Sequence, residues 1–268
     1  MRWHTEKIDF SSGTLQLHAM IYLPKGEGRF PGAVMCHGVA SDHRSMRPSA
    51  QQLARRGCVA LTLDLRGHGK SDGTLDSDIG RDVIAAVEIL RNHAKVNGER
   101  IALVGHSMGA VASLYAATVA DDIKALVLLS LPAEMDGFMG FWSPMYAKAE
   151  RIGTTILEFP RLGPLPFIGW LNKLTFRFWM WIRGYKMRID IRQDTESWAA
   201  LNSSDNIAKI NDTPKLFMHC KGDKWLPYEK TVELYEKAKI PKEMVLLEGG
   251  FHVTPLLPGK PRESWISW

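Results

Sequence analysis

The chain has 268 residues, of which 45% are hydrophobic and 24% charged. This is the composition of an ordinary globular domain, and it excludes collagen, a coiled coil and a disordered chain. No stretch approaches the roughly 20 uninterrupted apolar residues that would span a bilayer. The opening residues, MRWHTEKIDF, lack the apolar run of a secretory signal, so we expect a cytoplasmic protein. The net charge of +5, from 34 basic and 29 acidic residues, is a small excess whose meaning depends on where it lies.

Apolar periodicity predicts short strands at the N-terminus, followed by strands that alternate with helices. The predicted strands cover residues 7–10, 15–23, 32–36, 59–65, 101–104, 123–129, 215–219 and 244–247. The predicted helices cover residues 46–56, 78–93, 108–119 and 228–239. Asp76 and Asp78 are expected to cap the second helix. Most of the strands are apolar at nearly every position, which is typical of parallel strands buried on both faces. The pattern predicts an α/β fold with a mostly parallel central sheet flanked by helices.

The alternation of strands and helices stops between residue 131 and about residue 205. Such a segment is too long to be a structureless loop inside a compact domain. We therefore expect residues 133–205 to form a helical cap, or lid, inserted into a core domain made of residues 1–132 and 206–268.

The expected cap also holds the excess positive charge. Residues 141–188 contain eight basic and two acidic residues, a net charge of +6, interleaved with eleven aromatic residues. This pattern suits an apolar lid over an acyl pocket, a membrane-surface patch, a funnel for anions, or a packed helical cap with solvated charges. We favour the lid, with Trp142, Trp179 and Trp181 as candidate substrate contacts. A weak contact of the cap with a membrane or lipid surface is left open, and no nucleic-acid partner is expected.

The sequence VGHSMG at residues 104–109 places a G-x-S-x-G motif directly between a predicted strand and a predicted helix. A serine on so sharp a turn needs small neighbours, which Gly105 and Gly109 supply on either side of His106 and the serine. The following helix points its positive end at the site, where it helps to stabilise an oxyanion. Ser107 is therefore the candidate nucleophile.

A serine hydroxyl is a weak nucleophile that needs a base within hydrogen-bond reach and usually a carboxylate to orient the base. Asp223 follows the predicted strand at 215–219, and His252 follows the next one. Both should lie on loops at strand ends, whereas Asp212 would emerge at the opposite end of the sheet. Ser107, His252 and Asp223 are thus the candidate nucleophile, base and orienting acid.

The other histidines are expected to have structural roles. His37, His68 and His106 belong to loop motifs, where an imidazole more often braces a loop than transfers protons. His219 lies within a predicted strand and is expected to be a core histidine with satisfied hydrogen bonds. The remaining four are expected at the surface or in strands, and they are His4, His18, His43 and His93.

Two further loops carry recognisable motifs, CHGV at residues 36–39 and DLRGHGKS at residues 64–71. With GHSMG and the chain order Ser107, Asp223, His252, they make nearly the whole chain resemble the α/β-hydrolase superfamily, and within it the capped serine esterase and lipase branch. The resemblance implies an oxyanion hole formed by the backbone N–H groups of Val39 and Met108. The chain departs from the family pattern at Ala110, where many relatives have a second glycine, and at 219–220, where His-Cys replaces His-Gly.

These observations predict a serine hydrolase that cleaves carboxylic esters through an acyl-enzyme intermediate, of the carboxylesterase or monoacylglycerol lipase kind. An amidase or peptidase of the same fold is the alternative, and a non-catalytic ligand-binding relative is a weaker one. No metal or cofactor is expected, because the sequence lacks H-E-x-x-H, paired C-x-x-C and Walker motifs. The three cysteines lie far apart in apolar runs, which suits buried reduced thiols.

Overall fold

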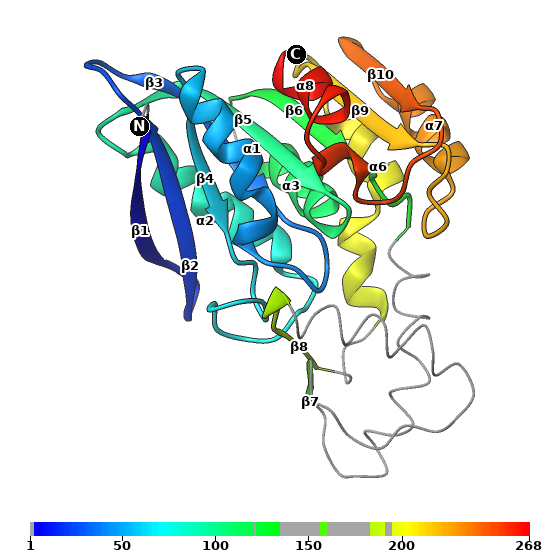
Figure 1. Cartoon of the computed structure of the whole chain (residues 1–268). Coiled ribbons are helices and arrows are strands. Elements are labelled where there is room, and N and C mark those ends of the chain that lie inside the picture. The colour runs from blue at the N-terminus through cyan, green and yellow to red at the C-terminus, as the bar shows by residue number, and fades with distance from the viewer. Residues whose placement is uncertain (1–2, 121, 135–155, 160–182, 191–194) are drawn as a thin grey trace.

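The structure is a computed structural model, and it describes residues 3–120, 122–134, 156–159, 183–190 and 195–268 (Figure 1). Its centre is an eight-stranded sheet with the strand order β1-β2-β4-β3-β5-β6-β9-β10. The strands are β1 (Trp3–Ser12), β2 (Leu15–Pro24), β3 (Phe30–Cys36), β4 (Val59–Leu63), β5 (Val96–His106), β6 (Ile123–Leu129), β9 (Lys215–Cys220) and β10 (Lys242–Leu247). Strand β2 pairs antiparallel with β1 and β4, and all other neighbours in the sheet are parallel. The predicted α/β fold with a mostly parallel sheet is confirmed.

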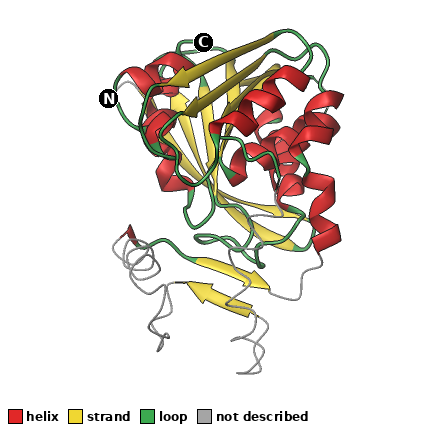
Figure 2. Cartoon of the chain, turned by 90° about the vertical axis from the view of Figure 1, so that its right-hand side faces the viewer, coloured by secondary structure: helices red, strands yellow, loops and turns green. Residues whose placement is uncertain are grey.

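Helices cover both faces of this sheet (Figure 2). They are α1 (His43–Arg55), α2 (Ile79–Arg91), α3 (Met108–Val119), α6 (Ser203–Lys209), α7 (Tyr228–Lys237) and α8 (Lys260–Ile266), with short 3-10 helices η1 (Thr195–Leu201) and η2 (Thr254–Leu256). Alternate residues of a strand enter different cores, because successive side chains point to opposite faces. In β3, Met35 packs in the core that contains residues of α1 and α8, while Val34 and Cys36 pack in the core that contains residues of α2, α3 and α7. Among the described helices, none is long and apolar enough to cross a membrane.

The start of α2 differs from the prediction. Asp78 occupies the N-cap position, but its side chain makes no capping hydrogen bond and instead pairs with Arg81 at 3.0 Å. The Asp76 carboxylate accepts the Asp78 N–H at 2.9 Å and pairs with Arg66 at 2.8 Å. Arg66 also pairs with the buried Asp82 at 2.8 Å. The predicted side-chain cap at Asp78 is wrong because the neighbouring arginines hold these carboxylates in ion pairs.

The described part of the insertion contributes two short strands, β7 (Ile156–Phe159) and β8 (Met187–Asp190), which pair antiparallel outside the central sheet (Figure 2). The backbone of β8 is tied to the loop after β4, since Arg188 donates its N–H to Gly67 O at 2.7 Å. Further along, Trp198 of η1 is buried in the main core. The end of the insertion therefore packs on the core domain, and the predicted helical cap over residues 133–205 stays a prediction, since much of it lies outside the described residues.

Candidate active site

Ser107 lies on a strained turn between the end of β5 and the start of α3. Its backbone dihedrals, φ 53° and ψ −123°, fall where side chains other than glycine are rare. The flanking glycines are required by close backbone contacts. A Cβ on Gly105 would lie 2.3 Å from Gly109 O, and a Cβ on Gly109 would lie 2.4 Å from Cys36 O. The chain can therefore make this turn only with glycine at both positions, and the turn presses α3 against the end of β3.

The acid and the histidine that were expected after β9 and β10 meet in the structure. His252 Nδ1 lies 2.6 Å from Asp223 Oδ2, and both residues are nearly buried. The other carboxylate oxygen, Oδ1, accepts the backbone N–H groups of Trp225 at 2.9 Å and Leu226 at 3.2 Å. Burial alone would raise the pKa of Asp223, but hydrogen bonds from His219 and His252 hold that pKa far below its ordinary value. The carboxylate is therefore ionised, and Nδ1–H of His252 donates to it.

The backbone carbonyl oxygen of His252 contacts His106, which precedes Ser107 on the turn, and Ser130. His106 Nε2 lies 2.9 Å from His252 O, and Ser130 Oγ donates to the same oxygen at 3.1 Å. Burial, followed by the charge of His252, lowers the pKa of His106 to about 3, so its ring is neutral and donates through Nε2. The structure records no hydrogen bond between Ser107 Oγ and His252. In structures without substrate, hydrogen bonds between catalytic groups are often long and tighten only in the substrate complex.

A second histidine contacts the same carboxylate. His219 Nε2 lies 3.2 Å from Asp223 Oδ2 and 3.1 Å from Leu226 O, and its Nδ1 lies 2.7 Å from Thr231 Oγ1. Both groups that face Nε2 are acceptors, so Nε2 must carry a hydrogen. His219 is a core histidine with satisfied hydrogen bonds, as its place in a strand predicted. Its contact with Asp223 was not predicted, because only the turn after β9 brings the two residues together.

The loop after β3 passes beside Ser107. A Cβ on Gly38 would lie 3.2 Å from the Cβ of Ser107, so only glycine fits there without displacement. His37 braces this loop: its Nδ1 lies 2.7 Å from Gly38 O, while its Nε2 accepts the N–H of Leu65 at 3.1 Å. Because Nε2 is an acceptor, Nδ1 carries the proton and donates to Gly38 O. Burial lowers the pKa of His37, which favours this neutral form.

His68 braces the other end of the same loop. Its Nδ1 lies 3.0 Å from Arg66 O, and its Nε2 accepts the N–H of Ala40 at 3.3 Å. Burial lowers the pKa of His68 to about 3. Val39 is therefore fixed between two braced residues. Among the residues that the structure describes, no hydrogen-bond partner is recorded for the N–H groups of Val39 or Met108, as a pair of oxyanion donors would require.

An apolar rim surrounds His252. The Trp225 ring lies 5.3 Å from the His252 ring, centroid to centroid, and is 67% exposed. Phe251 and Val253, on either side of His252, are 72% and 41% exposed. Sequence reasoning missed these residues, although large apolar side chains next to the acid and the histidine were a usable signal. The candidate cap contacts Trp142, Trp179 and Trp181 lie outside the described residues.

A serine on a strand-to-helix elbow, with acid and histidine at the ends of later strands of a mostly parallel sheet, is the arrangement of an α/β hydrolase. In agreement, the sequence profile of the Alpha/beta hydrolase family matches residues 33–263. The chain belongs to this family.

Some relatives are similar to the chain over most of its length, and others over less than half of it. It is 26% identical to the uncharacterized protein YfhR of Salmonella typhimurium over 255 residues, which is 92% of this chain and 74% of that protein. Over a shorter stretch of 113 residues it is 30% identical to a thermostable monoacylglycerol lipase of Bacillus sp. (strain H-257), covering 41% of this chain and 45% of the lipase. The first similarity extends through core and insertion alike.

Solved structures resemble the whole chain. The α/β hydrolase GrgF from Penicillium sp. sh18 superposes with a TM-score of 0.75 at 20% identity, covering 98% of this chain and 96% of that one. The esterase Pf2001 of Pyrococcus furiosus superposes with a TM-score of 0.70 at 21% identity, covering 99% of this chain and 88% of that one. At these identities the superpositions establish the fold alone.

Proposed function

We propose that the protein is a serine hydrolase that cleaves carboxylic esters through an acyl-enzyme intermediate. The observation that carries the proposal is the strained turn at Ser107, whose neighbour His106 contacts His252 of the His252–Asp223 pair, together with the N–H groups of Met108 on this turn and Val39 on the adjacent loop, for which no partner is recorded among the described residues. The names of two similar proteins, an esterase and a monoacylglycerol lipase, support the ester as the substrate class.

The reaction uses groups of this chain and one water. Ser107 Oγ attacks the ester carbonyl and gives its proton to Nε2 of His252, which then protonates the leaving alcohol. Asp223 holds the proton on Nδ1 and stabilises the imidazolium that forms. The N–H groups of Val39 and Met108 donate to the tetrahedral oxyanion. A water activated by His252 then hydrolyses the acyl-enzyme and restores Ser107.

The apolar rim supports an apolar acyl or aryl group as the part of the substrate that lies near His252. Trp225 and Phe251 expose most of their side chains beside the site, and contact with an apolar substrate would remove that surface from water. The tryptophans of the expected cap, Trp142, Trp179 and Trp181, are proposed to contact the substrate as well.

Replacement of Ser107 tests the proposal. Ser107→Ala should lower the hydrolysis of p-nitrophenyl butyrate by at least about 10³-fold, because it removes the nucleophile and leaves only binding and oxyanion stabilisation. Ser113→Ala is the matched control, since Ser113 is a buried serine on helix α3, which follows Ser107 directly. A fluorophosphonate probe should label the wild-type protein and the control but not Ser107→Ala. Turnover that is unchanged in Ser107→Ala would refute the assignment.

The same assay separates esters from amides. An ester and its isosteric amide are compared at equal concentration, and we expect turnover of the ester to be faster by several orders of magnitude. Comparable turnover of the amide would make the protein an amidase of the same mechanism. Absence of both turnover and probe labelling would make it a non-catalytic relative.

A further inference from the structure

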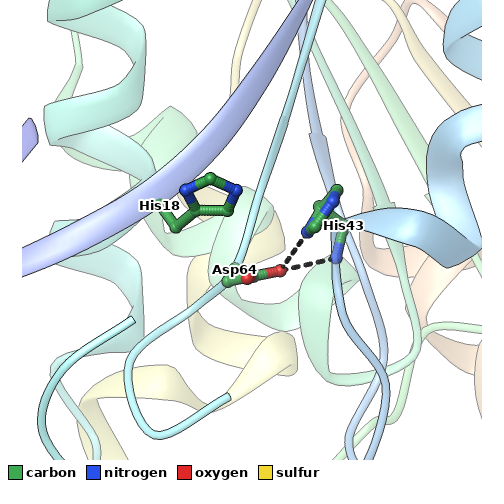
Figure 3. A group of neighbouring side chains, drawn as sticks. All are labelled: His18, His43 and Asp64. Atoms are coloured by element: carbon green, nitrogen blue, oxygen red, sulfur yellow. Dashed lines mark hydrogen bonds and ion pairs between the residues drawn. The ribbon is translucent and has the colours of Figure 1, made fainter. Parts of the chain in front are cut away.

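Two histidines and an aspartate from three segments that are distant in sequence lie together at the start of α1. His18 lies in β2, His43 is the first residue of α1, and Asp64 follows β4. One donor atom from each of the three lies within 4.8 Å of the others. Figure 3 shows the rings of His18 and His43 turned toward each other beside the Asp64 carboxylate. The side chain of His18 is 3% exposed, that of His43 13%, and that of Asp64 is fully buried.

His18 presents an unused acceptor to this cluster. Its Nδ1 lies 2.7 Å from Asp9 Oδ1. At this distance from a carboxylate oxygen, which accepts, Nδ1 of His18 carries the proton. The lone pair therefore resides on Nε2. No hydrogen-bond partner of Nε2 is recorded among the residues that the structure describes.

His43 and Asp64 form the other half of the cluster. His43 Nδ1 lies 2.7 Å from Asp64 Oδ1, which also accepts the backbone N–H of His43 at 2.8 Å. The second oxygen, Oδ2, accepts the N–H of Lys70 at 2.9 Å. Asp64 accepts all three of these hydrogen bonds, as a carboxylate does, and His43 Nδ1 becomes a second lone-pair donor once its proton moves to Nε2.

We propose that His18, His43 and Asp64 bind one transition-metal ion of the Zn²⁺ type. The ligands are Nε2 of His18, Nδ1 of His43 and Oδ1 of Asp64, with water in the fourth position, and on binding the Nδ1 proton of His43 moves to Nε2 of the same ring. Two imidazoles and one carboxylate suit Zn²⁺, whereas Mg²⁺ and Ca²⁺ prefer sets of six or more oxygens. The Asp9 carboxylate behind His18 is the partner that orients a metal-bound imidazole and fixes its tautomer.

The geometry needs only side-chain adjustment. Zn²⁺ bonds of 2.0–2.2 Å in a tetrahedron place ligand atoms about 3.3 Å apart. The contact between His43 and Asp64, at 2.7 Å, has to widen slightly, while the His18 ring approaches the other two donors by rotation of its side chain. The bound ion would join β2, the start of α1 and the loop after β4, and would thereby stiffen the loop of residues 37–42.

Titration with Zn²⁺ tests the proposal. The untagged full chain is freed of metal and titrated against a chromophoric chelator, and we expect one equivalent to bind. His18→Gln and His43→Gln should each weaken binding about 100-fold, and Asp9→Asn about 10-fold or more. His4→Gln combined with His93→Gln is the matched control. It removes the surface contacts of histidine with Glu6, 3.2 Å from His93 and 3.8 Å from His4, and should leave the affinity unchanged.

Spectroscopy and competing ions give independent readouts. Co²⁺ in place of Zn²⁺ should show visible absorption typical of a nitrogen and oxygen site of low coordination number, lost in His18→Gln. Mg²⁺ and Ca²⁺ should not compete. Unchanged Zn²⁺ affinity in His18→Gln, as expected if the ion bound at Asp223 and His252 instead, would overturn the proposal, and so would the absence of stoichiometric binding. If His43→Gln fails to fold, His18→Gln and Asp9→Asn decide the question.

Discussion

The change Asp223→Asn tests where the protons of the candidate site lie. The amide oxygen of asparagine has to take the Oδ1 position, because the backbone N–H groups of Trp225 and Leu226 point there. The NH₂ group then occupies the Oδ2 position and faces His252 Nδ1 and His219 Nε2. Since NH₂ only donates, His252 must accept through Nδ1, and its proton moves to Nε2. That nitrogen can no longer accept the proton of Ser107.

The expected loss is large in rate and moderate in stability. The equivalent tautomer error in a serine protease lowers kcat about 10⁴-fold, or about 5.5 kcal/mol of transition-state stabilisation at about 1.4 kcal/mol per tenfold. In addition, the new NH₂ group meets the N–H of His219, and a buried donor without an acceptor costs about 1–3 kcal/mol. The assays are ester hydrolysis at saturating substrate and unfolding in urea.

A second substitution separates the two effects. In the double variant Asp223→Asn with His219→Gln, the glutamine carbonyl can accept from the asparagine NH₂, so most of the stability should return while kcat stays low. His219→Gln alone should keep kcat within about tenfold of wild type, because the glutamine NH₂ can still donate to Asp223. The reasoning is refuted if Asp223→Asn retains more than about a tenth of wild-type kcat. A double variant no more stable than Asp223→Asn would refute the donor role of His219.

Three further predictions concern stability and substrate binding. The pKa values of His68 and His106 are lowered from 6.5 to about 3 in the folded chain. Between these two pH values the unfolded chain binds two protons that the folded chain does not bind. The free energy of unfolding should therefore fall by about 2.7 kcal/mol per pH unit as the pH is lowered from 6.5 to about 3. Urea midpoints at pH 7, 6 and 5 measure this, and equal midpoints would contradict it. Gly109→Ala should lower the free energy of unfolding, measured in urea, by about 1–3 kcal/mol, because the new Cβ meets backbone atoms that have to move. An unchanged free energy of unfolding would show that the turn at Ser107 can accommodate a side chain at this position. Trp225→Ala should raise KM for an octanoyl ester several-fold more than for an acetyl ester, with stability within about 0.5 kcal/mol; equal changes in KM would exclude an acyl contact.

The fold was predictable because parallel strands that are buried on both faces appear in the sequence as runs of apolar residues. Strand β5 shows where that signal fails, since 101–104 was predicted and the strand begins at Val96. Between Val96 and the predicted start lie residues 97–100, among them Asn97, Glu99 and Arg100, which are exposed or half-buried and so carry no apolar signal. Backbone pairing of Val96 with Phe30 nevertheless makes this segment a strand.

The residues of the candidate site were predictable to the extent that they stand in local motifs. Ser107 is flanked by its own glycines, and Asp223 and His252 each follow a recognisable strand. The cluster of His18 and Asp64 has no local signature, because it depends on strand register. Strand β2 pairs antiparallel with β4 so that Ala19 lies opposite Leu63, and the N–H of Asp64 donates to His18 O at 2.8 Å. Periodicity predicts strands but not the register between them, so it could not bring these two side chains together.

Acid sensitivity and the candidate oxyanion site depend on the same groups. His37 and His68 each use one ring nitrogen as donor and the other as acceptor, and these bonds hold Gly38 and Ala40 on either side of Val39. An imidazolium has two donors and no acceptor, so protonation of either ring breaks the bond that its Nε2 accepts. The burial that lowers the pKa of these rings therefore keeps Val39 in place at neutral pH. Protonation of His68 would break its bond from the Ala40 N–H, and protonation of His37 would break its bond from the Leu65 N–H, while the bond from His37 to Gly38 O would remain.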